Sequence, residues 1–177
     1  MNGQNFILVG SDSSDLERVG HRPELNHYRQ QTGFTCGAAA LSMITGFTEA
    51  QCRKLAQTTS RGTSSEHVLE ALRATGFSPH SVGFGSDGVA LEDVLPQLIR
   101  QSHRWPLYLA LRFDHEGRDS LNRKRGYVRH HDCVLSEGRF LDPGELHELD
   151  AEATGHLCQR GIRVVRYILV GGRPAAS

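Results

Sequence analysis

Residues 30–46 read QQTGFTCGAAALSMITG, and this stretch decides which fold the chain adopts. Thr35 is a residue that caps helices, an apolar run follows it, and Gly46 suits a left-handed stop, so the stretch predicts a helix over 36–45. Small or apolar side chains cover nearly every face of that helix. Such a helix belongs in the interior of a protein rather than on its surface.

The elements predicted around this helix are first helical and then extended. Capped or amphipathic stretches predict three more helices, over 49–57, 64–76 and 91–101. Apolar or alternating runs predict strands at 6–9, 77–84, 107–113, 127–135, 139–144 and 162–170. The polar residues 114–126 are expected to form a loop or a long hairpin tip, and 145–160 to be helical or irregular. Helices followed by a mostly antiparallel sheet favour an α+β fold over a doubly wound sheet.

The length of 177 residues suits one domain, which we expect to span 28–172 between an N-terminal extension (1–27) and a short tail (173–177). Twenty basic and twenty acidic residues cancel, which gives no electrostatic case for binding nucleic acid or an anionic membrane. No run reaches the roughly 20 apolar residues of a membrane span. Because the start also lacks a basic, apolar signal, we expect a cytoplasmic protein or one secreted without a signal peptide.

Cys36 is the candidate nucleophile. It lies at the first turn of the predicted helix, where unpaired amides and the helix dipole favour an anionic thiolate. The backbone amide of Cys36 can stabilise an oxyanion, and Gln30, in an extended segment six residues upstream, can fold back as the second donor. The alternative is that Cys36 is only a small buried apolar residue. The four cysteines form no CxxC pair and are expected to be free thiols.

A cysteine nucleophile needs a base, and the base needs an acceptor that orients it. Residues 130–143, HHDCVLSEGRFLDP, offer both on the two strands of one hairpin. With a two-residue loop His131 shares a face with Asp142, and with a three-residue loop His130 does. The turn alone leaves both histidines open as the base.

The order of these motifs resembles that of papain-like cysteine peptidases, and among them the bacterial bacteriocin-processing, double-glycine leader peptidases. Their pattern of Gln, five residues, then Cys-Gly-x-Ala-x-Leu-x-Met-Ile is matched from Gln30 to Ile44. Their later His-x-Val-Val-Leu and Asp-Pro signatures resemble residues 131–135 and 142–143. The resemblance covers roughly residues 28–145 and implies a papain-like fold. It also implies Cys36 as nucleophile, His131 as base, Asp142 as its orienter and Gln30 as oxyanion donor, with His130 as second choice for the base.

The resemblance implies a thiol peptidase that cleaves a peptide or isopeptide bond through a thioester, without a cofactor. No transporter region accompanies the motifs, so a free-standing enzyme acting on a peptide or protein is expected. The same residues could instead deamidate or transamidate a glutamine side chain, as an effector would. A non-catalytic binding module with a degenerate site is a further alternative. The sequence leaves the oligomeric state open.

Three arginines and a tryptophan are candidates for contact with the substrate. Arg123, Arg125 and Arg129 belong to a basic run that leads into the candidate base, and such a run either faces water or selects an acidic partner surface. Trp105 could line the site, although packing at the core or its rim is the alternative. The ten histidines form no HExxH and no ligand set of zinc spacing, so no metal site is predicted.

Overall fold

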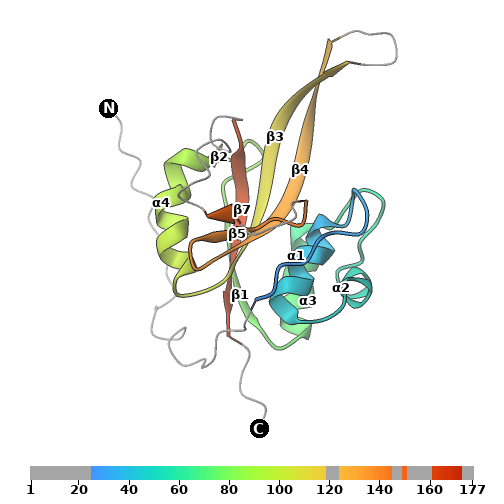
Figure 1. Cartoon of the computed structure of the whole chain (residues 1–177), viewed down its shortest axis with the longest axis vertical. Helices are drawn as coiled ribbons and strands as arrows, with labels where there is room; N and C mark the ends of the chain where they lie inside the picture. The colour runs from blue at the N-terminus through green and yellow to red at the C-terminus, as the bar shows by residue number, and fades with distance from the viewer. Residues whose placement is uncertain (1–24, 119–123, 145–148, 151–160, 173–177) are drawn as a thin grey trace.

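The structure is a computed structural model that describes residues 25–118, 124–144, 149–150 and 161–172. The predicted strand at 6–9, the tail at 173–177 and most of 145–160 lie outside these residues. The elements in chain order are α1 (Cys36–Thr45), α2 (Glu49–Leu55), α3 (Ser65–Ala74), β1 (Ser78–Gly83), β2 (Val89–Ala90), α4 (Leu91–Ser102), β3 (Leu107–Arg118), β4 (Lys124–Ser136), β5 (Arg139–Leu141), β6 (Leu149–Asp150) and β7 (Arg163–Gly171) (Figure 1).

The strands form one sheet in the order β1-β7-β3-β4-β5-β6, and β2 also pairs with β7. Every pairing among the described residues is antiparallel. Helices α1 to α3 precede most of this sheet in the sequence. The predicted α+β class, with the Cys36 helix packed against a mostly antiparallel sheet, is therefore confirmed.

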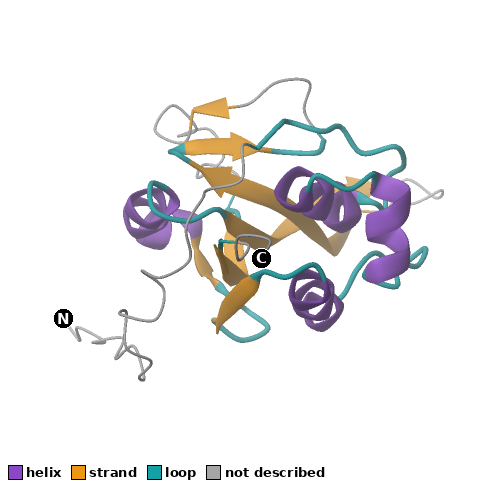
Figure 2. Cartoon of the chain, turned by 90° about the horizontal axis from the view of Figure 1, so that it is seen from below, coloured by secondary structure: helices purple, strands orange, loops and turns teal. Residues whose placement is uncertain are grey.

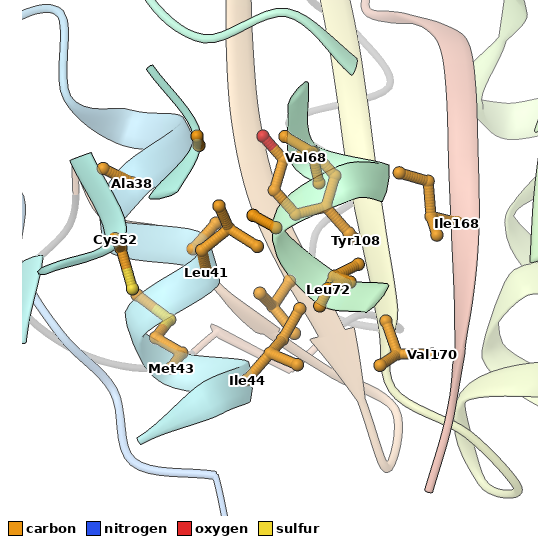
Figure 3. Close-up of a cluster of buried hydrophobic side chains, with 14 of the residues drawn as sticks. Ala38, Leu41, Met43, Ile44, Cys52, Val68, Leu72, Tyr108, Ile168 and Val170 are labelled. Atoms are coloured by element: carbon orange, nitrogen blue, oxygen red, sulfur yellow. The ribbon is translucent and has the colours of Figure 1, made fainter. Parts of the chain in front are cut away.

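Each face of the sheet carries its own hydrophobic core. Helices α1, α2 and α3 cover one face, and α4 covers the other (Figure 2). Strand β3 contributes to both cores, because Tyr108 faces α1 and α3 while Leu107 and Leu109 face α4. Figure 3 shows the Tyr108 ring beside Val68 and Leu72 of α3. This double burial explains why β3 begins with a continuous apolar run.

The predicted elements agree with the observed ones except at their margins. Helix α1 has the predicted bounds, and nine of its ten residues are buried. Helix α2 ends two residues earlier than predicted, at Leu55. Strands β2 and β6 were not predicted, because two residues are too few to show an alternating pattern. Within 114–126, β3 continues to Arg118 and β4 begins at Lys124, so these residues extend a hairpin.

The outer part of the β3–β4 hairpin extends beyond the body of the sheet (Figure 1). Among the described residues, Arg112 opposite Arg163 is the last pair that joins β3 to β7. On the other side, β5 pairs with β4 only over Val134–Ser136. The stretch of β4 just before Val134 thus lies at an edge of the described sheet, where another element can approach it.

Candidate active site

Cys36 opens helix α1 and is buried, with 8% of its surface exposed. Thr35 occupies the capping position as predicted, but its side chain does not cap the helix. The Thr35 hydroxyl instead donates to the Thr32 carbonyl oxygen at 3.1 Å and accepts from the Thr32 amide at 3.2 Å. The amides of the first turn of α1 are therefore left without a cap from Thr35, in the position where a helix favours an anion.

The turn between β4 and β5 selects which histidine meets Asp142. Its loop has two residues, Glu137 and Gly138, and both have positive φ, at 52° and 74°. Such a turn matches the twist of the flanking strands and fixes their register, with Val134 opposite Leu141. The two-residue loop puts His131 on the same face as Asp142, whereas His130 is exposed on the alternate face.

His131 and Asp142 form a hydrogen-bonded pair, with Nε2 at 2.7 Å from Oδ1. The same carboxylate oxygen accepts a hydrogen bond from the Gly144 amide at 2.7 Å. Burial works against the charged imidazolium, but the hydrogen bonds to Asp142 and Cys36 outweigh it and raise the pKa of His131 to about 10. Burial likewise opposes ionisation of Asp142, yet its bond to His131 leaves the pKa of this carboxyl below its usual value. The pair therefore favours imidazolium and carboxylate.

The amino end of α1 meets β4 at these residues. Because Nε2 of His131 is engaged by Asp142, Nδ1 is the ring nitrogen left for the neighbouring Cys36 thiol. The Cys36 sulfur also lies 3.6 Å from Oδ2 of Asp132, the next residue of β4. Strand alternation puts Asp132 on the opposite face from His131, so the sulfur at the strand edge meets both side chains. Sequence reasoning missed Asp132, whose only signal was its place after His131.

The segment that carries Gln30 is held beside Asp142. The Gln30 amide donates to the Pro143 carbonyl oxygen at 2.9 Å, and the His27 ring is 2.9 Å from the Asp142 carbonyl oxygen. The Gln30 side-chain oxygen is buried and has no hydrogen-bond partner among the described residues. These contacts place the backbone of the Gln30 segment against the Asp142–Pro143 turn, and the predicted approach of the Gln30 side chain to Cys36 stays a prediction.

The other sequence candidates have separate positions. Trp105 connects α4 to β3 and packs, half-buried, against the core under α4, so its ring serves packing there. The backbones of Arg125 and Arg129 pair with Gly117 and Phe113 in the β3–β4 hairpin. The side chains of these two arginines are not among the described parts of the structure. Arg123 lies outside the described residues altogether.

Other kinds of site have no counterpart in the described part of the chain. Cys36, Cys52 and Cys133 are free thiols, and Cys158 is outside the description. No cluster of three or more His, Cys, Asp or Glu residues suited to a metal ion occurs among the described residues. None of the helices described is long and apolar enough to cross a membrane.

Comparisons with known proteins find similarity to solved peptidase domains. No protein-family model and no curated protein sequence matches the chain. A double-glycine motif protease from an AMS/PCAT transporter, solved with its leader peptide, is similar at a TM-score of 0.55 and 16% identity, over 87% of this chain and 94% of that one. The peptidase domain of Streptococcus ComA, a bifunctional ABC transporter of a quorum-sensing pathway, gives a TM-score of 0.49 at 16% identity over 85% and 100%. The Streptococcus mutans ComA peptidase domain gives 0.43 at 17% identity over 81% and 96%. At 16% identity, the similarity to the AMS/PCAT protease shows only a shared architecture, which is the α+β fold of papain-like peptidase domains.

Proposed function

We propose that the chain is a cysteine peptidase that cleaves a peptide or isopeptide bond, with residues 28–172 as its catalytic domain. The observation that carries the proposal is the 2.7 Å pair of His131 and Asp142 next to Cys36 at the amino end of α1. A nucleophile, a base and a group that orients the base are the three parts that nucleophilic catalysis by a thiol requires. The raised pKa of His131, about 10, favours transfer of the thiol proton to the ring.

The reaction would proceed through a thioester. The Cys36 thiolate attacks the carbonyl carbon of the scissile bond, and the resulting oxyanion accepts hydrogen bonds from the Cys36 amide and the Gln30 side-chain amide. The His131 imidazolium gives its proton to the leaving amine, and the carbon–nitrogen bond breaks. His131 then removes a proton from water, and the hydroxide attacks the thioester. The carbon–sulfur bond breaks, which releases the acid product and returns Cys36 to the thiolate. Asp142 keeps the ring oriented through both steps.

The substrate class in this proposal is an extended peptide. A solved double-glycine motif protease of the same fold was captured with the leader peptide, so peptides that contain Gly-Gly are the first to test. The deamidase and transamidase alternatives use the same residues but release ammonia from a glutamine side chain. Products therefore distinguish the alternatives.

The test is an unbiased peptide library that includes Gly-Gly sequences, read by mass spectrometry for new amino termini and by an ammonia assay. Cys36→Ala and His131→Ala remove the nucleophile and the base, and His130→Ala is the matched control on the exposed face of the same strand. We expect new termini with the wild type and with His130→Ala, and none with the other two variants. Cleavage that survives in Cys36→Ala would refute the proposal. Ammonia without new termini would replace it with a deamidase.

A further inference from the structure

Asp132 is a carboxyl group next to the candidate nucleophile, and the triad chemistry leaves it without a role. Its Oδ2 is 3.6 Å from the Cys36 sulfur, a distance within the range of a hydrogen bond to sulfur. It follows His131 directly on β4, so the two residues flank the sulfur from opposite faces of one strand. A second negative charge at this point would oppose formation of the thiolate.

The surroundings hold Asp132 in this position. Gly37, the residue after the nucleophile, leaves the space for it, because a Cβ at Gly37 would lie 3.0 Å from Oδ2 of Asp132. The groups that affect its charge are Cys36 on α1, the Tyr108 hydroxyl on β3 and His131 on β4 itself. Tyr108 is 1% exposed, and Figure 3 shows its hydroxyl pointing away from Ile44 and Val170. Among these neighbours only His131 can carry a positive charge, and it is already paired with Asp142.

We propose that Asp132 is a further catalytic residue, whose protonated carboxyl donates a hydrogen bond to the Cys36 thiolate and whose ionised form disfavours that thiolate. This inference rests on the proposed function, because it takes Cys36 as the nucleophile and His131 as its partner. The group acts on the reacting sulfur itself and tunes how much of the enzyme is in the reactive state.

The proton count fixes the direction of the effect. In the unreactive state Cys36 is a neutral thiol that donates to the Asp132 carboxylate, and His131 is a neutral ring. The pKa of about 10 belongs to the ring beside the Cys36 thiolate, whose charge and hydrogen bond are among its causes, so the ring beside a neutral thiol loses its proton at a lower pH. Uptake of one proton gives the reactive state: the thiol proton moves to His131, the added proton resides on Asp132, and the thiolate accepts hydrogen bonds from both. The reactive state holds one proton more, so its population falls as pH rises.

The pH range follows from the burial of Asp132. Loss of hydration raises the pKa of this carboxyl, and the charge of His131, the hydrogen bond from Cys36 and the nearby Tyr108 hydroxyl only partly oppose that rise, so that it reaches about 6. The three groups titrate together, so the transition belongs to the cluster rather than to Asp132 alone. The reactive thiolate should therefore be most populated in mildly acidic solution and decline towards neutral pH.

The experiment measures the Cys36 thiolate directly, as the ultraviolet absorbance of the wild type minus that of Cys36→Ala. We expect this absorbance to fall between about pH 5 and about pH 8, whereas an ordinary thiol only gains thiolate over that range. The Asp132→Asn side chain can still donate a hydrogen bond but cannot ionise, so the thiolate absorbance of this variant should stay high over the same pH range. The rate of Cys36 alkylation in that variant should then exceed the wild-type rate by about tenfold or more at about pH 8 and approach it at about pH 5.

The controls separate this inference from the proposed function. Asp93→Asn removes an exposed carboxyl on α4 and should leave the wild-type profile unchanged. If His131→Ala lowers the thiolate signal but the wild-type signal does not fall with rising pH, the role of Asp132 is refuted and the peptidase proposal stands. If His131→Ala leaves the signal unchanged, the proposed function fails and the inference with it. The wild-type profile decides the matter even if Asp132→Asn does not fold.

Discussion

Gly37→Ala tests whether the amino end of α1 is as closely enclosed as the structure requires. A Cβ at this position would lie 2.9 Å from Cβ of Thr63 and 3.0 Å from both Thr63 Oγ1 and Asp132 Oδ2. Carbon atoms in contact prefer about 3.5–4.0 Å, so Thr63 or Asp132 must move by several tenths of an ångström. Both neighbours belong to the surroundings of Cys36, so the displacement should alter its reactivity as well as the stability of the fold.

The magnitude follows from two opposing contributions. Overpacking of a tight interior site costs about 2–3 kcal/mol when two neighbours must shift. Replacing glycine by alanine within a helix returns about 1 kcal/mol. The net loss of about 1–2 kcal/mol in the free energy of unfolding corresponds to a decrease of about 2–8 °C in Tm for a chain of this size.

The assay is thermal unfolding followed by circular dichroism, combined with the alkylation rate of Cys36. Gly33→Ala is the matched control, because Gly33 is exposed and a Cβ there meets no atom within 4 Å. Gly33 also lacks a positive φ, so its replacement should leave Tm unchanged or slightly higher. Equal Tm values and equal Cys36 rates in the two variants would refute the packing of Thr63 and Asp132 against α1.

Three further predictions concern the charge pair and the core. Asp142→Asn should lower the pKa of His131, which an NMR titration of the ring will detect; an unchanged titration would contradict the pairing. The stability that the pair contributes should be greatest between about pH 4 and about pH 6.5, decline as pH rises above that window until it is gone above about 10, and be lost again as pH falls through the lowered pKa of Asp142. Leu72→Ala, at a fully buried position of α3, should cost about 2–5 kcal/mol in urea unfolding, whereas Leu55→Ala, 37% exposed, should cost less than about 0.5 kcal/mol. Similar costs at both positions would contradict the core.

Local signals in the sequence were sufficient for the helices and the long strands. Helix α1 could be bounded because its start, apolar run and stop glycine all lie within the helix and its flanks. Strand β6 could not be predicted, since two residues show no period and the pairing of Leu149 with Phe140 is their only signal. The extension of β3 to Arg118 could not be predicted for the same reason, because it depends on pairing with β4 and not on the polar residues themselves.

The candidate site shows the same division between local and long-range information. The pairing of His131 with Asp142 depended on the length of one turn, and Glu137 gave no signal of its positive φ because it is not a glycine. Asp132 could not be recognised, because its importance depends on the approach of α1 to the edge of β4 from 96 residues away. Residue types at fixed spacing predicted the chemistry of the proposed triad, whereas the tuning that we propose for it depends on contacts between distant segments.

Glu49 is a second buried acidic residue whose contacts bear on the candidate site, and unlike Asp132 it acts through the chain segment next to Gln30. It lies in the first turn of α2 with 1% of its surface exposed, and its Oε2 accepts a hydrogen bond from the Gln31 amide at 3.1 Å. Its Oε1 is buried with no hydrogen-bond partner in the described structure, an arrangement that costs stability. The bond to Gln31 fixes the residue after Gln30, so the fold retains a costly carboxylate where the proposed oxyanion donor has to be held.

Amide hydrogen exchange at Gln31 tests this role without a substrate. Glu49→Ala removes the acceptor, and exchange at Gln31 should accelerate about ten- to hundred-fold, as expected for loss of a hydrogen bond to a charged group. Glu49→Gln keeps an oxygen at the same place and removes the buried charge, so it should preserve most of the protection without loss of stability. Equal exchange rates in the wild type and Glu49→Ala would mean that the bonds of this segment to the Asp142–Pro143 turn are sufficient to hold Gln30.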